Sequence, residues 1–330
     1  MQMEFGFLFL GQELGKGLIL LQSITNPASQ QAERINRVFN SFNIAAAAML
    51  LLVSFLVVYI CIKFRTKKGD SSEPLQTKGN TKLEAVMIGV PALLLAYFFY
   101  QTVVIERAVA PAVDKTMQPD VIITGHQWWW EVEYPASKVV TANEVHLPIG
   151  KHLLMEMRSA DVIHDWWVPE LGNKMDLVPN MNNYLWLDIN KPGNYAGACS
   201  EFCGAQHAWM RINVVAQTQN DFNKWLALNQ SNAKAPGDTL AMAGEKLFQE
   251  KTCASCHRIQ GTAANAIVGP DLTHIGGRQE ILTGIMENNE GNLYKWINHP
   301  QEIKPGAHMP DFILEKDSVV AIAHYLIGLK

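Results

Sequence analysis

The sequence is poor in charged residues and in cysteine. Asp, Glu, Lys and Arg make up only 18% of the 330 residues, while apolar residues make up 48%, a balance that favours membrane segments. The net charge of −4 is too small to indicate nucleic-acid binding. Four of the five cysteines lie in two ligand-like motifs, so no disulfide framework remains. The fifth, Cys61, is expected to pack as a small hydrophobic residue in an apolar run.

One segment reads Cys-Ser-Glu-Phe-Cys-Gly-Ala-Gln-His-Ala-Trp-Met and carries Cys199, Cys203, His207 and Met210. These soft and intermediate ligands favour copper over calcium or magnesium. A single copper needs only one cysteine, whereas two thiolates on one loop can each bridge two copper ions. His207 would then bind one copper, and Met210 would lie weakly on the other. The second copper needs a further imidazole, for which His164 is the candidate.

The paired cysteines have two alternatives to copper. A C-x3-C pair is also compatible with a disulfide or with a zinc site. Zinc sites rarely recruit Met, and a disulfide has no use for the following His207 and Met210. The full spacing therefore favours a dinuclear copper site.

With Glu201 between the cysteines, the motif resembles the CuA site of cytochrome c oxidase subunit II, and the resemblance extends from about residue 43 to residue 215. It implies that the Glu201 backbone carbonyl binds one copper. It also implies that the Glu201 carboxylate faces a magnesium or manganese ion shared with subunit I. The family's first histidine ligand matches His164. Asp161 and Asp176 are expected to support the site, with ordinary surface acids as the alternative.

Two uncharged runs, residues 43–62 and 85–105, are each long enough to cross the ~30 Å hydrocarbon core as a helix. They predict a transmembrane helical hairpin spanning residues 43–106. Basic residues gather between the two runs, which places the connecting loop in the cytoplasm and everything after residue 106 outside. Those basic residues are Lys63, Arg65, Lys67, Lys68, Lys78 and Lys82. Residues 1–42 are expected to form a surface or interfacial helix, with a cleaved leader as the alternative.

Glu84 lies at the cytoplasmic start of the second run. A carboxylate there is stabilised by the helix dipole, typically by ~0.3–1 kcal/mol, and needs no other role. The oxidase resemblance implies more, because the family has a glutamate here at the entrance of a proton-uptake path into subunit I.

Between residues 107 and 216, short β-prone runs alternate with Pro, Gly and Asn, which predicts an antiparallel sandwich or small barrel. By the resemblance this domain is cupredoxin-like. The expected strands are 121–124, 132–134, 139–145, 153–157, 184–189 and 212–215. Metal ligands are expected on loops at one end, His164 among them. The aromatic run that contains Trp128 is typical of a core or a membrane-surface belt. The resemblance instead implies that Trp128 is exposed near the copper site and receives electrons.

Residues 217–238 are polar, with a helical turn expected near residues 222–228, and otherwise predict a flexible linker. Residues 239–330 predict an all-α domain. Its first helix, 239–249, is expected to cross its last, 318–329, at Gly244, because close crossing needs a small residue.

The pattern Cys253-Ala-Ser-Cys256-His257 indicates covalent attachment of haem c. The domain resembles class I cytochromes c. That resemblance implies that the Pro270 carbonyl holds the His257 ring and that Met309 is the second axial ligand. The rival ligands are His308, His274 and His299.

Haem c and dinuclear copper both carry single electrons, and the sequence has no further cluster of membrane histidines for an oxygen-reducing centre. The expected function is an electron-relay subunit that passes electrons to subunit I. The resemblance implies subunits I and III as partners, and a quinol-oxidising complex or soluble cytochrome as donor. It places the chain in the bacterial cytoplasmic membrane, with both metal domains on the periplasmic side. The alternatives are the CuA subunit of a nitric oxide reductase, or a membrane-tethered copper carrier or redox sensor without enzymatic activity.

Overall fold

The structure, a computed structural model, describes residues 23–65, 69, 79–110 and 116–330. It divides into two compact units: residues 33–111 form one, and residues 1–32 with 112–330 form the other. Residues 1–22, the first part of the segment for which a cleaved leader is the alternative, lie outside the described residues, as do the loop residues Lys67, Lys68 and Lys78.

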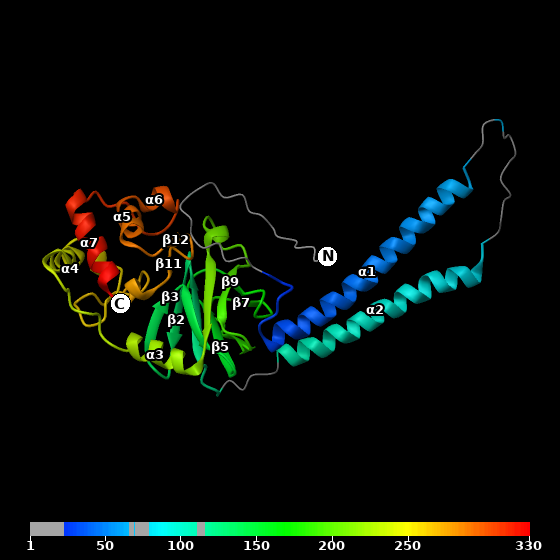
Figure 1. Cartoon of the computed structure of the whole chain (residues 1–330), viewed down its shortest axis with the longest axis horizontal. Helices are drawn as coiled ribbons and strands as arrows, with labels where there is room; N and C mark the ends of the chain where they lie inside the picture. The colour runs from blue at the N-terminus through cyan, green and yellow to red at the C-terminus, as the bar shows by residue number, and fades with distance from the viewer. Residues whose placement is uncertain (1–22, 66–68, 70–78, 111–115) are drawn as a thin grey trace. The chain divides into compact units, whose positions relative to one another are not determined.

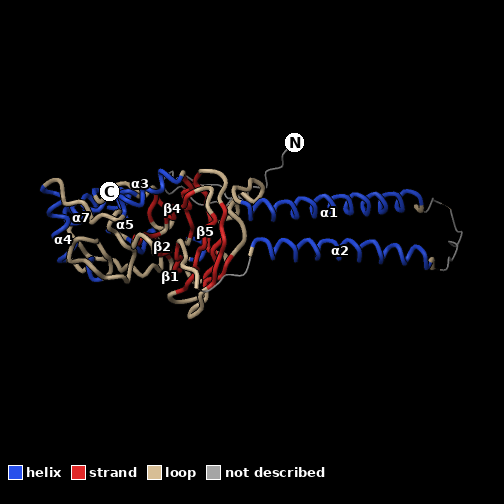
Figure 2. The backbone as a smooth tube through the Cα atoms, turned by 90° about the horizontal axis from the view of Figure 1, so that it is seen from below, coloured by secondary structure: helices blue, strands red, loops and turns tan. Residues whose placement is uncertain are grey.

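The smaller unit consists of two long apolar helices, α1 (Gln30–Lys63) and α2 (Thr81–Val109). Their most apolar 18-residue windows have mean hydropathies of 2.7 and 1.9, so both are long and apolar enough to span a membrane. The helices lie side by side (Figures 1 and 2), and the rings of Phe42 and Phe98 meet at 5.5 Å between centroids.

Helix α1 begins earlier than the sequence predicts. Residues 30–42, expected to be a separate surface helix, are its first turns, because no Gly or Pro interrupts the backbone hydrogen bonding there. Before it, residues 23–29 are not helical, and the Ala28 N–H donates to Glu170 O at 2.8 Å. Helix α2 begins at an Asn80 cap whose side chain accepts from the N–H groups of Lys82 and Leu83.

The first part of the larger unit is a cupredoxin-like sandwich of two five-stranded sheets (Figure 1). One sheet has the order β3-β2-β1-β5-β8, formed by Val139–Ala142, Trp129–Tyr134, Val121–His126, His152–Ser159 and Asn183–Asp188. The other has the order β4-β10-β9-β6-β7, formed by Glu144–Pro148, Arg211–Gln217, Gly193–Cys199, His164–Trp167 and Met175–Leu177. Fully buried side chains such as Ile123, Trp130 and Leu147 fill the space between them.

Two details of the expected sandwich are wrong. The sheets are not purely antiparallel, because β1 pairs with β5 and β4 pairs with β10 in parallel. The expected strand 139–145 is in fact two strands. At Asn143 the backbone turns with φ +66°, which sends β3 into one sheet and β4 into the other. Strands separated by such a crossover can meet their neighbours in parallel.

The sequence analysis also missed β6, β7 and β9. These strands contain Asp, Asn and Gly, which have low strand propensity, and pairing with neighbouring strands holds them in place. After β10, helix α3 (Gln219–Asn229) contains the expected helical turn. Its Trp225 ring packs on Tyr134 at 5.2 Å and on His146 at 4.1 Å, so α3 is part of the sandwich.

The C-terminal part is helical and contains α4 (Thr239–Glu250), α5 (Glu290–Asn298), α6 (Pro300–Ile303) and α7 (Lys316–Gly328), with a small hairpin of β11 (Glu280–Ile281) and β12 (Met286–Glu287). The Asp238 side chain caps α4 by accepting from Ala241 N at 2.8 Å. Helices α4 and α7 cross at Gly244, where an added Cβ would lie 2.1 Å from Ala321 O. Phe248 and Tyr325 pack beside this crossing.

Candidate metal and haem sites

The expected copper ligands come together at one end of the second sheet. His164 is the first residue of β6 and Cys199 the last of β9, so both lie on strands and not on loops as expected. The loop from β9 to β10 carries Cys203, His207 and Met210, with a short 3-10 turn at His207–Trp209 (η1). Pairing of β6 with β9 brings the two ends together, although 34 residues separate them in sequence.

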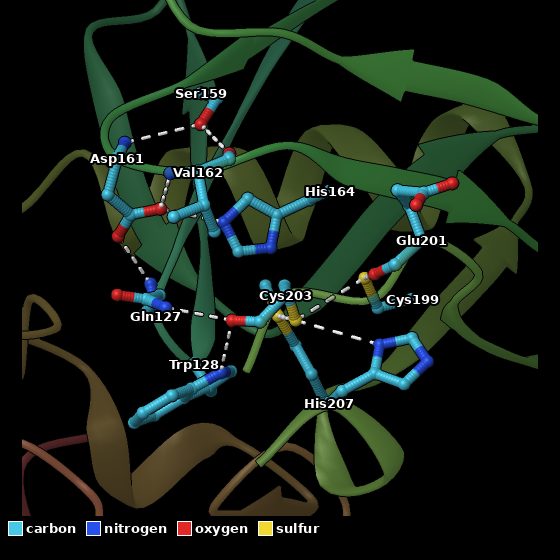
Figure 3. Close-up of polar contacts among 11 residues, drawn as sticks. Gln127, Trp128, Ser159, Asp161, Val162, His164, Cys199, Glu201, Cys203 and His207 are labelled. Carbon is cyan, nitrogen blue, oxygen red and sulfur yellow. Dashed lines mark hydrogen bonds and ion pairs between the residues drawn. The ribbon is translucent and has the colours of Figure 1, made fainter. Parts of the chain in front are cut away.

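The ligand atoms are close enough to share metal ions. The Cys203 sulfur lies 3.8 Å from the Cys199 sulfur and 3.6 Å from His207 Nδ1 (Figure 3). It lies 3.8 Å from the Met210 sulfur. A side-chain nitrogen of His164 and both cysteine sulfurs lie within 4.8 Å of one another. The Glu201 carbonyl oxygen lies 3.2 Å from the Cys199 sulfur. The cysteines are not joined by a disulfide, so both sulfurs are free to bind metal.

Burial and hydrogen bonding set the state of the candidate ligand atoms. His164 Nε2 pairs with Asp161 at 2.8 Å, while its Nδ1 is buried without a hydrogen-bond partner. An orphaned ring nitrogen beside two sulfurs fits a copper ligand. Burial opposes protonation of His164, but the Cys199 sulfur and Asp161 outweigh it and raise its pKa. The hydrogen bond between the two thiols, helped by His164, lowers the pKa of Cys199 to about 3, and the same bond raises the pKa of Cys203. The pair therefore favours one thiolate, the form of cysteine that binds metal.

Trp128 contacts the loop between β9 and β10 (residues 200–210, here called the copper loop) through the backbone of Cys203. Its indole N–H donates to the Cys203 carbonyl at 2.9 Å, and Gln127 Nε2 donates to the same oxygen at 2.8 Å (Figure 3). The Gln127 backbone N–H donates to Asp161 at 2.6 Å, so one carboxylate holds both this segment and His164. Trp128 itself is partly exposed.

The sequence analysis missed Asp165. This residue is buried, and its carbonyl accepts from Ser200 N at 3.1 Å, which ties β6 to the copper loop. Burial and the neighbouring Asp176 raise the pKa of Asp165 to about 7. Only its position directly after His164 could have indicated it. Asp176, expected to support the site, lies opposite Asp165 in β7.

The haem-attachment motif is also assembled. Cys253 begins a 3-10 turn, η2 (Cys253–Ser255), and neither it nor Cys256 forms a disulfide. His257 Nδ1 lies 2.8 Å from the Pro270 carbonyl, as expected. An added Cβ at Gly269 would lie 2.6 Å from the His257 ring, so the close approach requires glycine. Burial lowers the pKa of His257, which keeps the imidazole neutral for binding iron.

The three rival histidines have other partners. The His308 ring lies against Trp128 at 5.3 Å, His274 bonds Ser231 O at 3.0 Å, and His299 lies 3.9 Å from Glu302. Met309 remains the candidate. The sequence analysis missed Gln301, whose amide donates to the carbonyls of Ala307 and Met309 at 2.8 and 2.7 Å. Nothing in its sequence context indicates this role.

Comparison with known proteins identifies the families of both domains. Residues 136–217 match the family described as "Cytochrome C oxidase subunit II, periplasmic domain", and residues 241–330 match the cytochrome c family. A protein named cytochrome c oxidase subunit 2, from Alkalihalophilus pseudofirmus, is 34% identical over 297 residues, which cover 87% of this chain and 85% of that protein. The chain belongs to the cytochrome c oxidase subunit 2 family.

Two further subunit 2 proteins match over most of their length. The one from Bacillus sp. PS3 is 32% identical and the alignment covers 81% of this chain and 80% of that protein. The one from Bacillus subtilis is 28% identical, and the alignment covers 93% of this chain and 92% of that protein. Membership of the oxidase subunit 2 family, with a fused cytochrome c domain, implies CuA copper, haem c and a role in electron transport. It also implies partner subunits such as subunit I.

Proposed function

We propose that this subunit 2 relays single electrons from an external donor through haem c and CuA to subunit I, where oxygen is reduced to water and protons are translocated. Bound copper and haem c would each supply one-electron exchange at a fixed place in the chain. One observation carries the proposal. Two free cysteine sulfurs lie 3.8 Å apart, beside the orphaned Nδ1 of His164 and the side chains of His207 and Met210.

The proposed function gives each copper and haem ligand its own role. The CuA ligands would be the side chains of His164, Cys199, Cys203, His207 and Met210 with the carbonyl of Glu201. Asp161 would hold the His164 ring through Nε2 and leave Nδ1 for copper. Cys253 and Cys256 would attach the porphyrin, with His257 and Met309 on the iron. The Pro270 carbonyl would accept a hydrogen bond from His257 Nδ1, which fixes the tautomer of that ring and leaves Nε2 for iron.

The copper loop offers a surface for subunit I. Glu201 is exposed, and the neighbouring Phe202 is 76% exposed, which is unusual for a large apolar side chain next to a buried cysteine. Figure 3 shows Glu201 and Trp128 on opposite sides of the cysteine pair. This arrangement supports a magnesium or manganese ion shared with subunit I through the Glu201 carboxylate, and electrons entering on the Trp128 side.

The membrane hairpin would place Glu84 at a proton entrance. Glu84 lies in the first turn of α2, with Lys82 beside it. Lys63 is the last residue of α1, and Arg65 follows it by two positions. These basic residues support a cytoplasmic loop, with the CuA and cytochrome domains on the periplasmic side of the bacterial membrane. The partners would be subunits I and III, with a quinol-oxidising complex or soluble cytochrome as donor.

The purified complex tests this proposal. We expect it to take up oxygen and not nitric oxide, with an electron paramagnetic signal split equally by two copper nuclei. Cys203→Ser should abolish that splitting and lower oxygen uptake by about 100-fold, while Cys61→Ser should change neither. Glu84→Gln should slow proton uptake with the copper signal intact. Nitric oxide consumption would point to the alternative reductase, and a chain without haem or partner subunits to a copper carrier.

A further inference from the structure

One segment of the cytochrome domain is seated directly on Trp128. Lys304 Nζ donates to the Trp128 carbonyl at 3.0 Å, and the His308 ring lies 5.3 Å from the indole ring at an interplanar angle of 56°. Both residues belong to the segment that also carries Met309. The segment with the proposed haem ligand therefore contacts the residue that bonds to the copper ligand Cys203.

Lys304 is unusual because it is buried, with only 5% of its surface exposed. Within the described residues it forms no ion pair with a carboxylate; its second hydrogen bond is to Thr283 Oγ1 at 3.3 Å. Burying an ammonium group is costly unless its N–H groups find acceptors. Burial lowers the pKa of Lys304 to about 8, while the nearby Cys203 acts in the opposite direction. The Trp128 carbonyl, from the other domain, is thus one of the acceptors that make this burial tolerable.

A second group of contacts fixes the cytochrome domain at another point of the sandwich. The Gln279 backbone N–H donates to the buried Glu144 carboxylate at 3.0 Å, and Asn194 Nδ2 donates to the Gln279 side chain at 3.1 Å. Thr283 Oγ1, which accepts from Lys304, donates to the Trp209 carbonyl beside His207 and so extends the first contact. Contacts at two separate points define an orientation, which one contact alone does not.

We propose that Lys304 and His308 are positioning residues that seat the cytochrome domain on Trp128, Lys304 through the Trp128 carbonyl and His308 through ring contact. The inference rests on the proposed roles of Trp128 and Met309. The docking itself transfers no electron. The short link keeps the cytochrome domain at high effective concentration near the copper domain. Docking then sets the orientation in which the two domains meet and the fraction of time they spend in contact.

Hydrogen exchange of the intact oxidase tests this directly. The Gln279 amide is bonded across the interface, so its exchange reports opening of the docked state. Loss of a hydrogen bond from a charged group predicts a rise of about 10- to 100-fold in Lys304→Met. Lys295→Met removes the same charge from an exposed site and should change nothing. The Leu272 amide, bonded to Arg258 within the cytochrome domain, should stay protected in both variants.

Two further variants keep the test decisive. If Lys304→Met also raises exchange of the Leu272 amide, the cytochrome domain has unfolded in that variant. Thr283→Val then replaces Lys304→Met in the test, and the same rise in Gln279 exchange is expected. His308→Ala should raise Gln279 exchange by about 2- to 10-fold, and His308→Phe should restore protection by replacing the ring contact. An unchanged haem reduction potential in His308→Ala and His308→Phe would show that Met309 is undisturbed.

The outcomes separate two failures. Unchanged Gln279 exchange in Lys304→Met or Thr283→Val with Leu272 protected, or an equal rise in Lys295→Met, overturns the docking role. If electrons injected at haem c do not reach copper in the unaltered oxidase, the proposed function fails instead. If docking matters for the relay, Lys304→Met slows arrival at copper while Lys295→Met does not.

Discussion

The copper site and the haem site are built in different ways. His164 and Met210 are fully buried, and Cys199 and Cys203 are 5% and 2% exposed; strand ends and a tight loop hold them. Cys253, Cys256 and His257 are only partly buried, on a short turn and the loop that follows it. The buried core of the sandwich contains more side chains than that of the cytochrome domain. Because a small core supplies little stability by itself, bound haem would contribute much of the stability of the cytochrome domain.

The largest effect should come from removing each cofactor in turn. In Cys253→Ser/Cys256→Ser, which cannot attach haem, we expect amide exchange in α4 and α7 to rise by about 100-fold or more. Removal of copper by a chelator should change exchange in β5 and β10 by less than about tenfold. Mass spectrometry of the exchanged protein measures both. Equal responses of the two domains would show that the contrast between the sites is wrong.

A smaller effect is expected where the two cytochrome helices cross. Gly244→Ala would place a Cβ 2.1 Å from Ala321 O and 2.7 Å from the Tyr325 Cβ, so α4 and α7 must move apart. Overpacking of this kind costs about 1–3 kcal/mol or more. Denaturant unfolding followed by haem absorbance measures the loss. Gly237→Ala, where an added Cβ meets nothing within 4 Å, is the control, and the copper signal should be the same in both variants.

The smallest effect should be a pH dependence confined to the cytochrome domain. His324 bonds Asp238 at 3.0 Å and Glu290 at 3.2 Å; these contacts, Asp238 first, raise the pKa of His324. The hydrogen bond between His324 and Asp238 also lowers the pKa of Asp238. The stabilisation is therefore full between about pH 4 and pH 6.5. It is lost as the pH rises through the His324 pKa, or falls through that of Asp238.

Thermal unfolding of the haem domain across this pH range measures the effect. His324→Gln should flatten the profile on the alkaline side. His299→Gln, at a more exposed histidine, should leave the profile as it is. A profile of the same shape in His324→Gln would assign the dependence to another group.

Structural features that depend on residues close together in the sequence were predicted well. The apolar runs became α1 and α2, the Asp238 cap and the Gly244 crossing are present, and His257 meets Pro270 as expected. Three strands were missed and one was wrongly joined, because strand pairing overrides the low propensity of β6, β7 and β9. The supports of the sites were missed for a related reason: Asp165, Gln301 and Lys304 act through partners distant in sequence or through backbone atoms.

The sequence by itself determined which residues are candidate ligands, since the chemistry of two Cys-containing motifs depends on residue type and on spacing within a few positions. It also determined the two long apolar helices, because the length of an apolar run is a local property. The tertiary structure decided that His164 meets Cys199 at the ends of paired strands, and that Lys304 and His308 meet Trp128 across a domain boundary. Such contacts depend on where distant segments pack, and no local pattern encodes that.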